Sequence, residues 1–241
     1  MASMVDRETP FAARLAAVRD RIAEACRSAG RDPAEVRLVG VSKTRPAAEV
    51  LAALEAGLAD FGENYAQELE RKAREVQEAG GRPRWHFIGH LQTNKVRRVL
   101  PLLASVHSVD RPSLVRELGA GTDPGHPLEV FVEVNLGDEA SKTGVRAADA
   151  EDLCRQVLAA PGLRLVGLMG MPPLAPDPEA SRPHFRRLRD LLRDLQRRLP
   201  CPPETFRHLS MGMSDDLEVA VQEGATWVRV GTALFGPRRT P

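Results

Sequence analysis

Lysine is rare in this chain, so the few lysine positions draw attention to amine chemistry. Of the 34 basic residues in a sequence of 241, only four are lysines, namely Lys43, Lys72, Lys95 and Lys142. The neutral amine of a lysine can attack a carbonyl carbon to form a Schiff base, whereas arginine stays charged in proteins. Each of the four can also be an ordinary solvated side chain, so its place in the fold must decide.

Two segments near the C-terminal end combine glycine with hydroxyl side chains. Residues 210–214 read SMGMS and precede a helix, and residues 229–232 read RVGT at the end of an apolar run. Hydroxyls and backbone N–H groups in such turns bind anions such as phosphate. Either segment alone is weak evidence, because such a turn is usually only a helix cap, but the two together favour a phosphate site formed by Ser210, Met211, Gly212, Ser214, Gly231 and Thr232.

The hydropathy pattern predicts the elements that position these residues. An amphipathic helix over 9–30 comes first, and eight β/α steps then fill 36–236. Strands are expected at 36–42, 60–64, 85–89, 105–109, 128–135, 163–169, 206–211 and 227–235. Helices are expected at 46–57, 65–79, 93–103, 112–118, 147–159, 182–198 and 215–223.

This alternation predicts an α/β fold, a single (β/α)₈ barrel domain over 1–241 with an extra N-terminal helix. Near-continuous apolar strands are typical of parallel sheets that helices cover. An open doubly wound sheet is the alternative, but no GxGxxG follows the first strand. The Pro-rich residues 171–178 are expected to form a stiff loop after the sixth strand.

The barrel prediction separates the lysines by position. Barrel active sites lie at the C-terminal ends of the strands, and phosphate commonly binds after strands seven and eight. Lys43 follows the first strand and Lys142 the fifth, whereas Lys72 and Lys95 fall in expected helices. Lys43 is therefore the candidate amine, and an amine facing a phosphate site indicates pyridoxal 5′-phosphate (PLP).

Other residues are weaker candidates for the site. Glu63, Asn64, Tyr65 and His86 could line the barrel mouth, although capping and packing explain them as well. His86 and His90 lack the Glu of an HExxH motif, so no metal site is predicted.

The net charge of +1 argues against nucleic acid or an anionic membrane as partner. No signal peptide or apolar span is visible, so we expect a cytoplasmic protein, and the three scattered cysteines predict neither a disulfide nor a zinc site.

Five ordered motifs resemble those of the pyridoxal phosphate homeostasis proteins, the YggS/PROSC family. They cover nearly the whole chain: VSKT (41–44), FGENYAQE (61–68), WHFIGHLQTNK (85–95), LSMGMSDD (209–216) and VRVGTALFG (228–236). Ala66 stands where the family usually has Val, and Gly170–Met171 replace the usual Thr-Ile. These departures leave the lysine and the phosphate positions intact.

The resemblance implies a monomeric barrel like the N-terminal domain of alanine racemase, which binds PLP and has no established catalytic reaction. It implies that Lys43 carries PLP as a covalent internal aldimine and that Asn64 lies beside the ring. Ser210, Ser214, Gly231 and Thr232 would surround the phosphate, and Arg229 would face the pyridine nitrogen. A permanent cation there disfavours protonation of the nitrogen and weakens the ring as an electron sink.

Three functions follow from these expectations. The first is a PLP carrier and buffer that influences amino-acid and keto-acid metabolism and passes the cofactor to apo PLP-dependent enzymes. The second is an amino-acid racemase, but racemases of this type pair the lysine with a tyrosine from a second domain, and here the only tyrosine is Tyr65. The third, a phosphosugar enzyme without PLP, leaves Lys43 without a role.

Overall fold

Eight short strands, all parallel, close into a barrel in the computed structural model, which describes residues 10–137, 143–173 and 175–237. The strands follow chain order, and the last pairs with the first, with Gly40 opposite Val230. Their bounds are β1 (Arg37–Val41), β2 (Asp60–Glu63), β3 (Arg84–Phe87), β4 (Leu103–Val109), β5 (Leu128–Asn135), β6 (Leu163–Met171), β7 (His208–Ser210) and β8 (Trp227–Val230). The predicted barrel class is confirmed.

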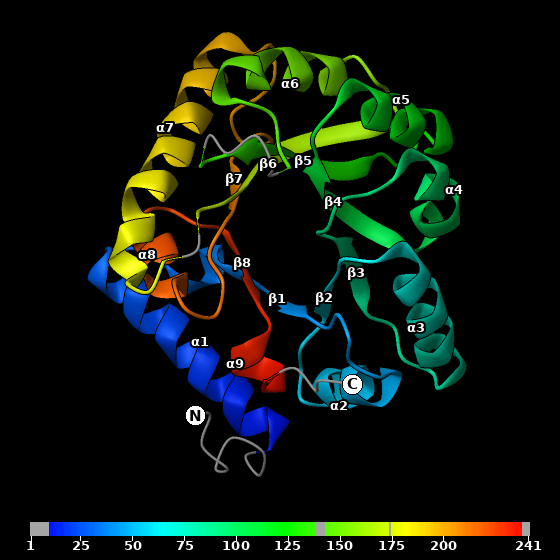
Figure 1. Cartoon of the computed structure of the whole chain (residues 1–241), viewed down its shortest axis with the longest axis vertical. Coiled ribbons are helices and arrows are strands. Elements are labelled where there is room, and N and C mark those ends of the chain that lie inside the picture. The colour runs from blue at the N-terminus through cyan, green and yellow to red at the C-terminus, as the bar shows by residue number, and fades with distance from the viewer. Residues whose placement is uncertain (1–9, 138–142, 174, 238–241) are drawn as a thin grey trace.

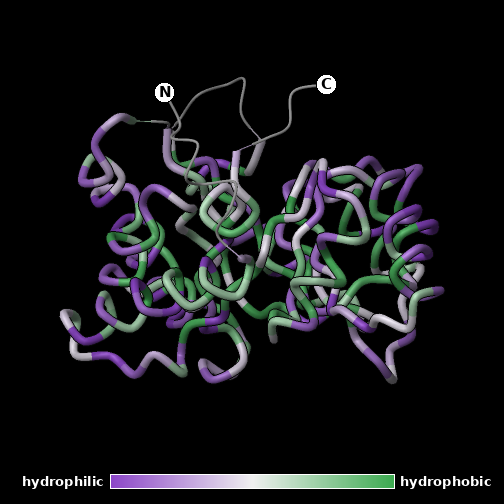
Figure 2. The backbone as a smooth tube through the Cα atoms, turned by 90° about the horizontal axis from the view of Figure 1, so that it is seen from below, coloured by the Kyte–Doolittle hydropathy of each residue, from purple (hydrophilic) through white to green (hydrophobic). Residues whose placement is uncertain are grey.

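Helices form an outer ring around the strands (Figure 1). They are α1 (Phe11–Ser28), α2 (Ala47–Glu55), α3 (Ala66–Glu78), α4 (Val96–Val99), α5 (Pro112–Gly121), α6 (Ala150–Leu158), α7 (Arg182–Arg198), α8 (Leu217–Gln222) and α9 (Thr232–Phe235). Hydrophilic residues gather on the outward turns of this ring (Figure 2). In the described parts of the chain, no helix combines the length and the apolar character needed to cross a membrane.

The N-terminal helix is confirmed, with bounds that differ slightly from the expected 9–30. Helix α1 begins at Phe11 and ends at Ser28, while Thr9, expected to cap it, lies outside the described residues. It packs against α8 and α9, with the Phe11 and Phe235 rings 5.2 Å apart. The first and last helices therefore cover the barrel beside the β8–β1 junction (Figure 1).

Two expected elements differ from the structure. The strand predicted over 227–235 ends at Val230, and its last apolar residues form α9, whose Leu234 and Phe235 pack toward Gly40. An apolar run of this length does not distinguish a buried strand from a buried helical turn. The helix predicted over 93–103 is helical only in short turns, because Pro101 cannot continue an α-helix, and β4 starts at Leu103.

The core has two parts, one between the barrel and the helices and one inside the barrel. The inner cluster contains Val39, Phe131, Val166, Met169 and Trp227. Polar side chains share this interior, since the rings of His86 and His107 lie 5.2 and 5.0 Å from that of Trp227.

We predict that acid destabilises the fold through its interior histidines. Burial lowers the pKa values of His86 and His107, and lowers that of His208 to about 4. In the unfolded chain these groups titrate near pH ~6.5. Between the folded and unfolded pKa values the unfolded state binds more protons, so stability falls as pH drops below ~6.5.

Urea unfolding at pH 7, 6 and 5 should therefore give decreasing free energies of unfolding. His208→Gln should make this pH dependence shallower than in the wild type and than in the surface control His126→Gln, at a histidine 91% exposed. A wild-type stability that is flat from pH 7 to 5 would contradict this account.

Candidate functional site

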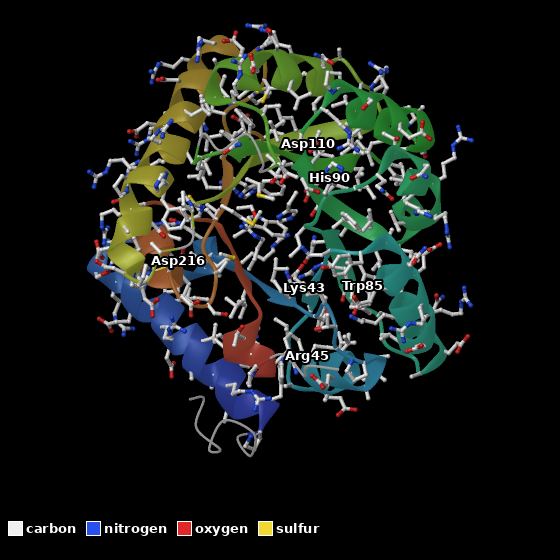
Figure 3. The ribbon with its side chains drawn as sticks, viewed as in Figure 1. Lys43, Arg45, Trp85, His90, Asp110 and Asp216 are labelled. Carbon is white, nitrogen blue, oxygen red and sulfur yellow. The ribbon has the colours of Figure 1, made fainter. Side chains whose placement is uncertain are left out.

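Lys43 lies two residues beyond the end of β1, in a turn held on both sides. The Ser42 N–H donates to Gly62 O at 3.1 Å, and the Arg45 N–H donates back to Ser42 O at 3.0 Å. Thr44 has a φ of 65°, which is unusual for a residue other than glycine, and its N–H donates to Glu68 Oε1 at 2.6 Å. The half-buried Lys43 side chain lies inside the ring of helices, beside β1 and β2 (Figure 3).

A second lysine supports this turn from behind. The Lys72 Nζ of α3 is buried and donates to Ser42 O at 2.6 Å, to Glu63 Oε1 at 2.5 Å and to Glu68 Oε1 at 2.9 Å. Burial raises the pKa of Glu63, although Lys72 and Ser42 act in the opposite direction. Three acceptors around one buried ammonium give Lys72 a structural role.

Arg229 is buried on β8 and directs its guanidinium into the barrel. Its Nη1 donates to Ser210 Oγ at 2.8 Å, and its Nη2 approaches Gly170 O at 3.3 Å. Burial lowers the pKa of Arg229 to about 10. This value is still well above neutral pH, so the guanidinium remains cationic there. In the described chain, no carboxylate lies within salt-bridge distance of it.

The loops after β7 and β8 touch each other, as predicted. Ser214 Oγ accepts the Ala233 N–H at 3.2 Å, and the Arg229 N–H donates to Gly212 O at 2.9 Å. Gly212 has a φ of 91°, and a Cβ there would lie 2.5 Å from the Ala220 Cβ, so this turn requires glycine.

Individual positions in these loops differ in what they offer. Thr232 is exposed and Gly231 half-buried, whereas the Met211 side chain is buried in the core and the Met211 N–H donates to Trp227 O at 3.0 Å. The Met213 N–H donates to Asp216 Oδ1 at 2.7 Å and is therefore already occupied.

Helix α1 contributes a contact that the sequence did not indicate. The Arg21 side chain donates to Ser214 O at 2.9 Å and pairs with Glu218 at 2.5 Å. The extra N-terminal helix thus fixes the position of the loop after β7.

Asn64 follows β2 at the same end of the barrel. Its Oδ1 is buried and has no hydrogen-bond partner among the described residues. Its backbone lies so close to Gly89 that a Cβ on Gly89 would come within 2.7 Å of Asn64 Cα. A hollow of about 350 Å³ adjoins it and is lined by Asn64, Tyr65, Gln67, Phe87, His90 and Lys95, among others.

His90 in this hollow contacts a carboxylate. Its Nδ1 lies 3.3 Å from Asp110 Oδ2 (Figure 3). The described residues contain no group of three or more His, Cys, Asp or Glu side chains that could hold a metal ion.

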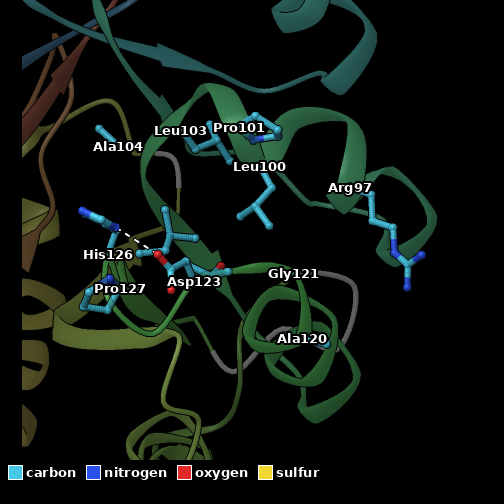
Figure 4. A pocket seen from close by; sticks show the side chains of 12 residues that line it. Arg97, Leu100, Pro101, Leu103, Ala104, Ala120, Gly121, Asp123, His126 and Pro127 are labelled. Carbon is cyan, nitrogen blue, oxygen red and sulfur yellow. Dashed lines mark hydrogen bonds and ion pairs between the residues drawn. The ribbon is translucent and has the colours of Figure 1, made fainter.

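A hollow of about 730 Å³ lies away from these residues, at the N-terminal ends of β4 and β5 (Figure 4). Leu103, Ala104 and Leu128 form part of its wall, and His126 bonds Asp123 at 3.0 Å on its rim. Its position at the opposite barrel end separates it from the lysine and the two loops.

The structure therefore gathers Lys43, Asn64, Ser214, Gly231 and Thr232 at one end of the barrel, with Ser210 and Arg229 inside it. Lys95 lines the same end, and Lys142 lies outside the described residues. Sequence reasoning missed His107, whose Nδ1 lies 2.8 Å from Ser210 Oγ, because a histidine in an apolar strand signals no particular partner.

Comparison of the sequence with known proteins finds a family model and relatives that agree with one another. The family model for the alanine racemase N-terminal domain matches residues 13–239. The pyridoxal phosphate homeostasis protein of Pseudomonas aeruginosa is 48% identical over 229 residues, covering 95% of this chain and 96% of that protein. The protein of the same name from Escherichia coli K12 is 42% identical over 229 residues, covering 93% and 95%.

Solved structures agree with these sequence relatives. PipY of Synechococcus elongatus, solved with PLP bound, superposes with a TM-score of 0.80 at 33% identity and covers 94% of this chain and 100% of that one. Alanine racemase of Clostridium difficile shares the fold, with a TM-score of 0.70 at 11% identity, over 96% of this chain and 57% of the racemase. The chain therefore belongs to the family of pyridoxal phosphate homeostasis proteins, on a barrel of the alanine racemase N-terminal type.

Proposed function

We propose that this protein binds PLP at the C-terminal end of its barrel and serves as a carrier and buffer of the cofactor. The observation that carries this proposal is that Lys43, Arg229 and the two Gly/hydroxyl loops meet there, on the adjacent strands β7, β8 and β1. A primary amine suits an aldehyde, and paired loops with hydroxyls suit a phosphate. The unpartnered Asn64 Oδ1 and the buried Arg229 guanidinium fit a polar ring between them.

In this proposal each residue has a separate task. Lys43 holds the aldehyde carbon of PLP covalently, with loss of one water. Ser214 and Thr232 enclose the phosphate through their hydroxyls and Gly212 and Gly231 through backbone N–H groups, while Ser210 and Met211 complete the loop beneath it. Arg229 faces the pyridine nitrogen, and Asn64 lies beside the ring.

A carrier rather than an enzyme follows from the same residues. Arg229 remains cationic, so it disfavours a proton on the pyridine nitrogen and leaves the ring a weak electron sink. A two-base racemase also needs an acid or base opposite the lysine. Within the described residues the candidates are Tyr65, which is 58% exposed, and His90, which already contacts Asp110.

We further propose that the protein works in the cytoplasm as a monomer of one barrel domain and passes PLP to apo PLP-dependent enzymes. The near-zero net charge supports only the expectation that neither nucleic acid nor a membrane surface is a partner, because no long-range field attracts the protein to them.

The attachment residue is the first prediction from this proposal. The purified protein with PLP should absorb visible light, and borohydride reduction should fix a pyridoxyl group on Lys43, located by peptide mapping. Lys43→Ala should lose the absorbance band, whereas Lys95→Ala, at a lysine of the same barrel end, should keep it. A reduced adduct on Lys95 or Lys142 in the wild type would show that the assignment to β1 is wrong.

The phosphate loops give a second prediction. Replacing Ser214 and Thr232 together by Ala removes two hydroxyl donors to a charged acceptor, each worth about 1.5–3 kcal/mol where buried. PLP affinity should fall at least about tenfold by this reckoning, while affinity for unphosphorylated pyridoxal changes much less. Equal losses for the two ligands would mean that the residues do not contact phosphate.

A third prediction distinguishes the carrier from the racemase. L- and D-alanine incubated with the PLP-loaded protein in deuterated water should show negligible exchange of the α-proton by NMR, with Lys43→Ala as the blank. PLP should instead move to an added apo-enzyme and restore its activity. Exchange that depends on Lys43 and turns over at about 1–10³ s⁻¹, the usual range of enzymes, would support the racemase instead.

A further inference from the structure

A continuous chain of hydrogen bonds crosses the barrel interior. It joins six buried side chains, here called the central chain: Asp60, His86, Ser105, His107, Ser210 and Arg229. Its five contacts, taken in that order, measure 2.9, 2.7, 2.9, 2.8 and 2.8 Å. The central chain thus connects the first residue of β2 with the guanidinium on β8.

The two ends of the central chain have opposite hydrogen-bonding capacities. Burial alone would raise the pKa of Asp60, but hydrogen bonds from Arg84 and His86 hold it well below its usual range. Asp60 is therefore a carboxylate that can only accept, whereas the Arg229 guanidinium can only donate. The hydrogen bonds of the four residues between them must therefore be arranged so that Asp60 only accepts and Arg229 only donates.

The carboxylate end fixes the first half of the chain. His86 must donate from Nε2 to Asp60, and because burial lowers its pKa it is neutral, so its Nδ1 is an acceptor. The Ser105 hydroxyl consequently donates to His86 Nδ1. The Ser105 oxygen is then left to accept from His107 Nε2.

The second half follows in the same way. Burial, together with the charges of neighbouring groups, lowers the pKa of His107 well below its usual value, so with Nε2 protonated its Nδ1 is an acceptor. The Ser210 hydroxyl donates to that nitrogen, and its oxygen accepts from Arg229 Nη1. All five bonds therefore point the same way, from Arg229 to Asp60.

This direction determines what holds Arg229. Its two hydrogen-bond partners are the neutral oxygens of Ser210 and Gly170, and the nearer one turns a lone pair toward Arg229 when the Ser210 proton points toward His107. If His107 carried its proton on Nδ1, Ser210 would have no acceptor there for its own proton. The orientation of the guanidinium thus depends on residues that lie deeper in the barrel.

We propose that His107, Ser105, His86 and Asp60 are positioning residues that hold the Arg229 guanidinium in the orientation needed to donate to the pyridine nitrogen of PLP. This inference rests on the proposed function for its ligand, but the direction of the chain does not. The four residues act through Ser210 and touch neither the cofactor nor a substrate.

The direction of the central chain can be measured without cofactor. Nitrogen-15 NMR of the apo protein should show both His86 and His107 as neutral rings protonated on Nε2. A cationic His107, or one protonated on Nδ1, would overturn the proposal, and this measurement needs no variant that could misfold.

The effect on the cofactor is tested with two buried serines of the same strand. Ser105→Ala interrupts the central chain, whereas Ser108→Ala removes a hydroxyl that donates to Gly89 O, outside it. Binding of PLP is compared with binding of the analogue in which carbon replaces the ring nitrogen. Ser105→Ala should weaken PLP binding at least fivefold and analogue binding less than twofold, while Ser108→Ala should leave the ratio of the two dissociation constants unchanged.

The outcomes separate this inference from the proposed function. Absence of PLP binding by the wild type would overturn the proposed function, and with it the role of the chain toward the cofactor. PLP binding by the wild type, with equal losses for both ligands in Ser105→Ala or with no loss, would overturn the positioning role alone.

Discussion

The pairing of β8 with β1 is the constraint on which the rest of the site depends. It joins the two ends of the sheet in register, with Gly40 opposite Val230. Gly40 lets Leu58 pack closely against the strand, because a Cβ at this position would lie 2.5 Å from the Leu58 Cδ2 methyl. Only a closed barrel brings the turn that holds Lys43 next to the strand that holds Arg229, residues separated by most of the sequence.

The interior of this barrel is unusually polar for a core, and that polarity has a cost. A charged guanidinium and a carboxylate are both removed from water inside it, and neither pairs directly with the other. Buried charges are tolerated only when hydrogen bonds satisfy them. Arg84 pairs with Asp60 at 2.6 Å, and the two histidines and two serines between Asp60 and Arg229 add hydrogen bonds that all run in one direction. Polarity that would weaken a purely structural core thus gives the guanidinium a fixed orientation.

The sequence predicted the barrel and the positions at its mouth, because both depend on local patterns. Short apolar runs after turn residues locate the strands, and a strand end followed by Lys or by Ser and Gly locates Lys43 and Ser214. The prediction that residues 232–235 belong to a strand was wrong, because they form the helical turn α9. This turn is buried against α1, and burial gives it the same apolar composition as a strand. The roles of Lys72 and His107 could not be predicted. Lys72 contacts Glu63 and His107 contacts Ser210 only because of the order and register of the strands, which a single sequence does not reveal.

The same features explain how a binding site for a reactive cofactor can avoid reaction. The aldehyde and the phosphate of such a ring attach it to a protein, whereas its ring nitrogen governs how well it stores electrons. An amine at the end of β1 and hydroxyls at the ends of β7 and β8 serve the first without affecting the second. In the proposed site, a cation that cannot accept a proton, held by a chain of hydrogen bonds ending on a carboxylate, would keep the nitrogen unprotonated. The proposed contact of Arg229 with that nitrogen would then both add to affinity and lower reactivity, which suits a carrier of the cofactor.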